Sequence, residues 1–80
     1  MNAHQEKFLT PGQSRAARKL LGWSQTRLAK VAGLGLSTVY DLECQRRDVS
    51  AASVEKMRKA LEAAGVEFTN GKQPGVRLRE

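Results

Sequence analysis

The sequence predicts a compact, mainly α-helical domain of four helices, followed by a short β-hairpin. Apolar residues recur at helical spacing in four successive segments, and glycine or polar residues separate each segment from the next. After residue 65 the pattern changes to alternating apolar and polar residues, which is typical of strands. We therefore expect a flexible tail at residues 1–9, a helical domain at 10–64 and a hairpin at 65–80.

The first helix is expected from Pro11 to about Leu21. Thr10 can cap its N-terminus, and Gln13, three residues later, completes a capping box. Gly22 ends the helix, because glycine readily adopts the left-handed conformation that closes helices.

The second helix is expected to be only two turns long. Ser24 can cap it, Trp23 can pack on Leu28 as a hydrophobic staple, and Gly33 ends it. Such a short helix has little stability of its own, so packing against its neighbours must hold it.

The third and fourth helices differ in their start signals. The third begins near Leu36, where Gly35 is a tolerated but poor N-cap, and runs to about Cys44. Ser50 can cap the fourth helix, which continues through Ala64.

The hairpin has one apolar face, and the residues between its strands are rich in turn formers. Because an isolated two-stranded hairpin is marginal in water, this face must be covered. It can form a dimer interface with a second subunit, or it can cap the core of its own subunit. The residues that form this face are Val66, Phe68, Val76 and Leu78.

The charge of the chain is strongly basic and unevenly spread. The 80 residues include 14 Lys and Arg against 8 Asp and Glu, a net charge of +6. Residues 1–47 hold 8 basic and 3 acidic residues, and residues 48–80 hold 6 and 5, so the excess is +5 in the first part and +1 in the second. A polyanion is the natural partner for the basic first part.

The composition argues against several other functions. The one cysteine, Cys44, and the one histidine, His4, cannot form a disulfide or a metal site, and we expect no metal and no cofactor. No nucleophile–base pair, carboxylate pair or phosphate-binding glycine loop points to an enzyme. No long apolar run or export signal is present, so we expect a cytoplasmic protein associated with the nucleoid.

The glycine turn between the second and third helices is typical of a helix-turn-helix. Two helices that cross steeply after a short turn need a small residue where their backbones approach, and Ala29 meets this need. They also need a turn residue that tolerates positive φ, and Gly33 provides it. The positions expected to face inward are all apolar: Leu28, Ala32, Leu34, Val39 and Leu42.

Two stretches, RKLLGWSQTRLAKVAGLGLSTVYDLE and QRRDVSAASVEKMRKALEAAGV, resemble the Xre family of phage Cro and repressor-type helix-turn-helix regulators. The resemblance covers about residues 10–64 and implies a lambda repressor-like fold. It also implies that the third helix enters the major groove of double-stranded DNA, in the docking geometry known from the phage repressors. The base-reading residues that it implies are Leu36, Ser37, Thr38, Tyr40 and Asp41.

The chemistry of these side chains agrees in part with base reading. Ser37 and Tyr40 can donate and accept hydrogen bonds, Asp41 can accept one from a cytosine amino group, and Leu36 can contact a thymine methyl group.

Phosphate contacts are expected at both ends of the motif. Gln25 lies at the positive end of the second helix, and its counterpart in the family commonly holds a phosphate. Arg46 and Arg47 follow the third helix and can clamp the DNA backbone farther along the same strand.

We also expect an ion pair between Arg18 and Glu43. Glu43 follows the inward-facing Leu42, so its carboxylate needs a cationic partner to offset desolvation. In the family, the residue at this position often pairs with a basic residue of the first helix, which implies Arg18 here.

These observations lead to the hypothesis of a sequence-specific DNA-binding regulator, a repressor that binds an inverted-repeat operator as a homodimer. Two alternatives stay open. One is a helix-turn-helix antitoxin that regulates its own operon and binds a toxin, and the other is an excision or architectural factor of a mobile element. For the leading hypothesis, we expect a regulator of a prokaryote, a phage or a mobile element.

Overall fold

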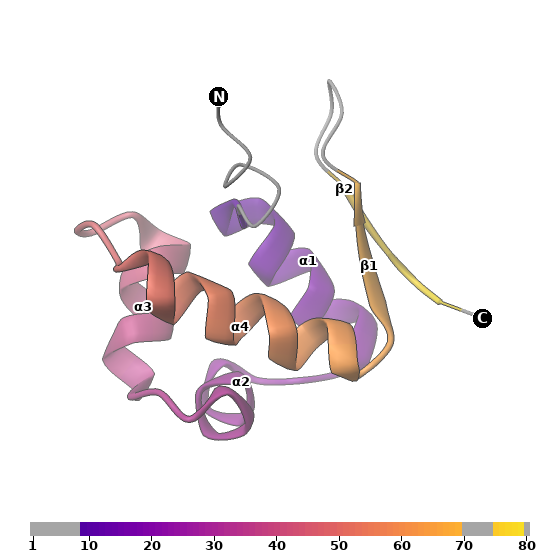
Figure 1. Ribbon diagram of the computed structural model, residues 1–80, viewed down its shortest axis with the longest axis horizontal. Coiled ribbons are helices and arrows are strands. Elements are labelled where there is room, and N and C mark those ends of the chain that lie inside the picture. The colour runs from indigo at the N-terminus through magenta and orange to yellow at the C-terminus, as the bar shows by residue number, and fades with distance from the viewer. Residues whose placement is uncertain (1–8, 70–74, 80) are drawn as a thin grey trace.

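The structure of the chain is a computed structural model that describes residues 9–69 and 75–79, and it confirms the mainly α-helical fold. Four helices precede a two-stranded antiparallel sheet (Figure 1). In chain order the elements are α1 (Pro11–Leu21), α2 (Gln25–Ala32), α3 (Leu36–Cys44), α4 (Ala51–Ala63), β1 (Val66–Thr69) and β2 (Gly75–Leu78). Residues 1–8 of the predicted tail and residues 70–74 of the predicted turn lie outside the described residues.

The helix starts follow from their capping side chains. The Gln13 backbone N–H donates to Thr10 Oγ1 at 2.9 Å, and the Thr10 N–H donates to Gln13 Oε1 at 3.0 Å, which completes the capping box. Ser24 and Ser50 cap α2 and α4 by accepting a hydrogen bond from the backbone N–H of Arg27 and of Ser53, respectively. Gly35 offers α3 no capping side chain, as the sequence predicted.

Left-handed residues end the first three helices. Gly22 and Gly33 have φ of 72° and 73°, conformations that glycine adopts without steric cost. The residue that ends α3 is instead Gln45, with φ of 54°. The sequence carries no glycine signal for this turn.

The core is shared by all four helices and the first strand. Its buried members are Leu9, Ala17, Leu28, Ala29, Val39, Met57, Ala60, Leu61 and Val66. The sequence placed Leu9 in the flexible tail, and this boundary is wrong because Leu9 is only 1% exposed. Burial of a leucine side chain contributes roughly 1.5–3 kcal/mol, which offsets the cost of ordering the residue.

The hairpin lies against α1 and α4 of its own subunit. Cross-strand partners pair Val66 with Leu78 and Phe68 with Val76. Val66 is fully buried in the core, and Phe68 and Val76 pack against the core. Val66 is therefore not available to a dimer interface, which corrects that part of the expectation. Of this apolar face, Leu78 remains the exposed member, at 43%.

Side-chain hydrogen bonds also tie the hairpin to α1. Gln13 Nε2 donates to the backbone oxygens of Thr69 and Gly75, each at 3.2 Å. The hairpin and α3 lie on opposite sides of the molecule, with α4 between them (Figure 1). The predicted recognition helix is therefore well separated from the hairpin.

Candidate nucleic-acid interface

The outer face of α3 presents apolar, hydroxyl and aromatic groups to solvent. Leu36 is 49% exposed and Tyr40 is 41% exposed. Ser37 between them is also exposed, whereas Thr38 is half-buried. Four of the five predicted base-reading residues thus reach the surface in whole or in part.

The inner face of α3 packs on α2, and the predicted turn joins the two helices. Val39 and Ala29 are buried, and the Leu34 backbone N–H donates to the Ala29 oxygen at 2.9 Å. This hydrogen bond closes the C-terminus of α2 just after Gly33, so the short turn sets how α3 leaves α2. The predicted positions of Ala29 and Gly33 agree with this geometry.

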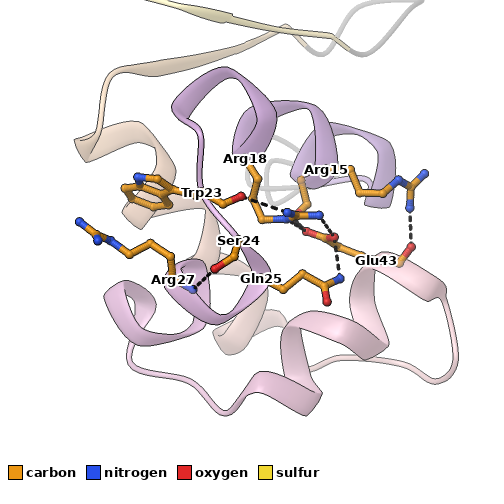
Figure 2. A network of polar contacts seen from close by, with 8 residues as sticks. Arg15, Arg18, Trp23, Ser24, Gln25, Arg27 and Glu43 are labelled. Carbon is orange, nitrogen blue, oxygen red and sulfur yellow. Dashed lines mark hydrogen bonds and ion pairs between the residues drawn. The ribbon is translucent and has the colours of Figure 1, made fainter.

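Glu43 joins α1, α2 and α3 in one polar network (Figure 2). Arg18 Nε lies 2.8 Å from Glu43 Oε2, and Arg18 Nη2 lies 2.7 Å from Oε1. Ser14 Oγ donates to Oε2 at 2.5 Å, and Gln25 Nε2 donates to Oε1 at 3.0 Å. The ion pair expected between Arg18 and Glu43 is therefore present, in the two-bond form that fixes orientation best.

The network explains why a carboxylate is stable at this buried position. Burial raises the pKa of Glu43, but the hydrogen bonds from Arg18, Ser14 and Gln25 and the positive charge of Arg18 lower it more, so the pKa lies below its ordinary value of 4.5. The pKa of Arg18 is raised, mainly through its hydrogen bond to Glu43. Glu43 is thus charged and fully hydrogen-bonded at neutral pH.

Gln25 lies where the sequence expected it, at the N-terminus of α2, but its side chain points at Glu43 (Figure 2). An amide nitrogen has two hydrogens, so one remains for another acceptor beside the backbone N–H of the first helical turn. The sequence could not show this contact, because it joins residues that are 18 positions apart.

Asp41 differs most from its expected role. The residue is only 7% exposed, and its Oδ2 atom lies 2.6 Å from Arg47 Nε. Arg46 Nε lies 4.0 Å from the other oxygen. The carboxylate that was expected to face a base is instead held by the two arginines that were expected to contact phosphate.

Arg46 and Arg47 remain accessible despite these contacts. Their side chains are 64% and 67% exposed, and the guanidinium of Arg46 lies 5.5 Å from the centre of the Tyr40 ring. Positive charge therefore lies directly beside the exposed face of α3.

Two residues of the site were missed by sequence reasoning. Ser14 donates to Glu43, and Arg15 Nη1 donates to the Glu43 backbone oxygen at 2.5 Å. Ser14 lies one helical turn before Arg18, so the i, i+4 spacing was an available signal once Arg18 had been paired with Glu43. Nothing local indicates the contact of Arg15.

Other kinds of site find no support in the part of the chain that the structure describes. Within residues 9–69 and 75–79, no cluster of three histidine, cysteine or acidic side chains could hold a metal ion. The described helices also include none with the length and apolar character that a membrane span requires. Cys44 is exposed as a free thiol at the end of α3.

Comparison with known protein families agrees with the helix-turn-helix arrangement of α2 and α3. A family model described as helix-turn-helix matches residues 15–69, which include most of α1, all of α2 to α4 and β1. The chain matches none of the curated proteins. The match covers more than half of the chain and includes the turn at Gly33, the exposed face of α3 and the Arg18–Glu43 pair. The chain therefore belongs to the helix-turn-helix family, and it is a DNA-binding regulator of the Xre and Cro type.

Proposed function

We propose that the protein is a repressor that binds an inverted-repeat operator in double-stranded DNA as a homodimer. The observation that carries the proposal is the division of α3 into two faces. Its inner face is fixed by the core and by Glu43, and its outer face exposes Leu36, Ser37 and Tyr40 beside two arginines. A rigid helix with an exposed face of this kind can enter the major groove.

Base reading rests on Leu36, Ser37 and Tyr40, with Thr38 at the edge of the surface. The hydroxyls of Ser37 and Tyr40 can exchange hydrogen bonds with base edges, and Leu36 can contact a thymine methyl group. These side chains include no arginine or glutamine, the residues that most often form two hydrogen bonds with one base. We therefore expect discrimination through several modest contacts.

Backbone binding rests on the two ends of the motif. Arg46 and Arg47 provide accessible positive charge after α3, and the N-terminus of α2 provides backbone N–H groups at Gln25. Phosphate contacts of this kind set the register of the protein on DNA but carry no sequence information.

Dimerisation is proposed because one short helix reads only about four or five base pairs. Two copies related by a two-fold axis read two half-sites about 34 Å apart. We place the interface at the hairpin, through the outer edge of β2 and the exposed side chain of Leu78.

The test begins with footprinting of the DNA upstream of the gene, which identifies the operator. Ser37→Ala should reduce the preference for the operator over a scrambled duplex and leave weak, salt-sensitive binding, since phosphate contacts remain. Unchanged discrimination in Ser37→Ala, Leu36→Ala and Tyr40→Phe alike would rule out base reading by this face.

The arginines need a charge-matched control. Arg46→Ala/Arg47→Ala should weaken binding to all sequences and reduce the slope of log K against log salt by about one unit for each lost phosphate contact. Lys56→Ala/Lys59→Ala removes the same charge from exposed residues of α4, outside both α3 and the hairpin, and should change the slope much less. Equal effects in both double variants would show that only net charge matters.

A further inference from the structure

The end of α3 and the segment that follows it contain a cluster of four residues whose arrangement simple base reading does not explain. We define the Asp41 cluster as Asp41, Tyr40, Arg46 and Arg47. Its centre is Asp41, whose side chain is 10% exposed and whose carboxylate oxygens lie 2.6 Å from Arg47 Nε and 4.0 Å from Arg46 Nε. The Tyr40 ring lies beside the guanidinium of Arg46, 5.5 Å from the ring centre.

The backbone holds the same cluster together. Arg46 N–H donates to the Asp41 backbone oxygen at 3.0 Å, and Gln45 N–H donates to the Leu42 oxygen at 3.3 Å. These two bonds and the left-handed Gln45 form a Schellman motif, which turns the chain sharply after α3. Asp41 is therefore bound to the segment after α3 twice, through its backbone oxygen and through its carboxylate.

The atoms used in these contacts matter for DNA binding. Asp41 engages the Nε atoms of the arginines, which lie nearest the side-chain stem. Among the described residues, Arg47 donates to Asp41 through Nε, its terminal nitrogens make no hydrogen bond, and its side chain is 67% exposed. A guanidinium can donate from both positions at once, so Arg47 can keep Asp41 while its terminal nitrogens bind a phosphate.

The carboxylate also has an electrostatic cost. A negative charge beside two arginines lowers the positive field that attracts DNA, and it would repel a nearby phosphate. The carboxylate also gives a benefit that offsets this cost. A long arginine side chain loses rotamer freedom when it binds DNA, and this loss opposes binding. An arginine that is already held in place has lost much of that freedom before DNA arrives.

We propose that Asp41 is a positioning residue of the DNA interface, whose carboxylate holds Arg47, and more weakly Arg46, so that their terminal guanidinium nitrogens face a backbone phosphate of double-stranded DNA. The inference rests on the proposed phosphate contacts of these arginines. It assigns Asp41 a role that acts through the arginines and involves no contact with a base.

The main test is a double-mutant cycle read by fluorescence anisotropy, with a mixed-sequence duplex and the footprinted operator as probes. Asp41→Asn keeps the shape of the side chain and raises the net positive charge by one. It should weaken binding to both duplexes by about two- to fivefold, the range that an exposed arginine–carboxylate pair supports. It should also reduce the salt slope between about 50 and 200 mM salt, and it should no longer weaken binding by this amount when Arg47→Ala is present.

Asp48→Asn is the matched control, because it makes the same charge change at an exposed neighbouring residue. It should leave binding unchanged or slightly tighter. If Asp41→Asn binds both duplexes as tightly as Asp48→Asn does, the carboxylate positions nothing and the inference is wrong. If Asp41→Asn keeps its affinity for the mixed-sequence duplex and loses only operator preference, Asp41 reads a base and the inference is also wrong.

A second variant is Arg47→Lys, which removes no charge and lies at an exposed side chain. A lysine has one terminal nitrogen in place of the separate Nε and terminal groups, so it cannot hold Asp41 and phosphate in the same fork geometry. Arg47→Lys should therefore weaken binding by about two- to fivefold, and equal affinity would contradict the inference. This variant keeps the proposal testable if Asp41→Asn lowers the folded fraction, which circular dichroism reports.

The inference and the proposed function fail in different ways. If Arg47→Ala leaves both affinity and salt slope unchanged, Arg47 contacts no phosphate, and the proposed function and the inference are both wrong on this point. If Arg47→Ala weakens binding and Asp41→Asn does not, the phosphate contact stands and only the role of Asp41 is wrong.

Discussion

Arg18 on α1 and Glu43 on α3 face each other with two hydrogen bonds, of 2.8 and 2.7 Å, between the guanidinium and the carboxylate. The Glu43 side chain is 1% exposed, and the Arg18 side chain is 16% exposed. The pair therefore fastens the inner side of the recognition helix to the first helix, at a point that solvent hardly reaches. Its geometry bears on the stability of the domain and on how firmly α3 is presented to DNA.

Arg18→Met should destabilise the fold by about 3 kcal/mol at neutral pH, because it leaves a buried carboxylate without its counter-charge. Equilibrium urea unfolding measures the change. Arg77→Met is the matched control, since the pair of Arg77 with Glu67 is 74% and 35% exposed and should be worth less than about 1 kcal/mol. Similar losses in the two variants would show that burial of the Arg18–Glu43 pair has no energetic consequence.

Acid should remove the contribution of Glu43 to stability. The pKa of Glu43 in the folded protein lies below its ordinary value of 4.5, so the unfolded chain takes up the proton first as the pH falls. The contribution is complete above pH 4.5 and is lost as the pH drops through the pKa of the folded state.

The measurement for this pH dependence is the free energy of unfolding at a series of pH values from neutral to acid. Glu43→Gln should have a flatter profile than the unmodified protein in the acid range, and Glu67→Gln, in an exposed ion pair, should leave the profile nearly unchanged. A Glu43→Gln profile parallel to that of the unmodified protein would contradict the assignment.

Gly33→Ala should destabilise the protein by about 1–2 kcal/mol, because Gly33 has φ of 73° and a Cβ is unfavourable in that conformation. Within the described residues, no atom outside the local backbone and the chain neighbours lies within 4 Å of the added Cβ, so the cost reflects backbone conformation and not a clash. Gly35→Ser is the matched control. Its backbone is extended, and a serine there can cap α3, so stability should stay constant or rise by a few tenths of a kcal/mol. Thermal unfolding of both variants distinguishes them.

Val66→Ala should cost about 2 kcal/mol, since Val66 is fully buried and the substitution leaves a cavity. Leu78→Ala should cost clearly less, because Leu78, the cross-strand partner of Val66, is 43% exposed.

The Leu78→Glu variant tests the proposed dimer interface at the hairpin. If the interface lies there, sedimentation should show a shift from dimer to monomer while the fold is retained. A dimer that persists in Leu78→Glu would place the interface elsewhere.

The helices and the turn of this protein could be predicted from the residue pattern alone. Thr10, Ser24 and Ser50 begin helices, and Gly22 and Gly33 end them, because capping and left-handed backbone conformations depend on residues only a few positions apart. The alternating pattern after residue 65 predicted the hairpin for the same reason. Local chemistry also required that Glu43 have a cationic partner.

In contrast, tertiary contacts decide which partner each of the outward-facing side chains binds and which of them are buried. Asp41 and Gln25 have side chains suited to DNA contacts, but Asp41 pairs with Arg47 and Gln25 joins Glu43. Val66 belongs to an alternating strand whose sequence suits an interface equally well, but it completes the core of its own subunit. Burial and pairing depend on which distant segments meet, and the residue pattern of a single helix or strand does not contain that information.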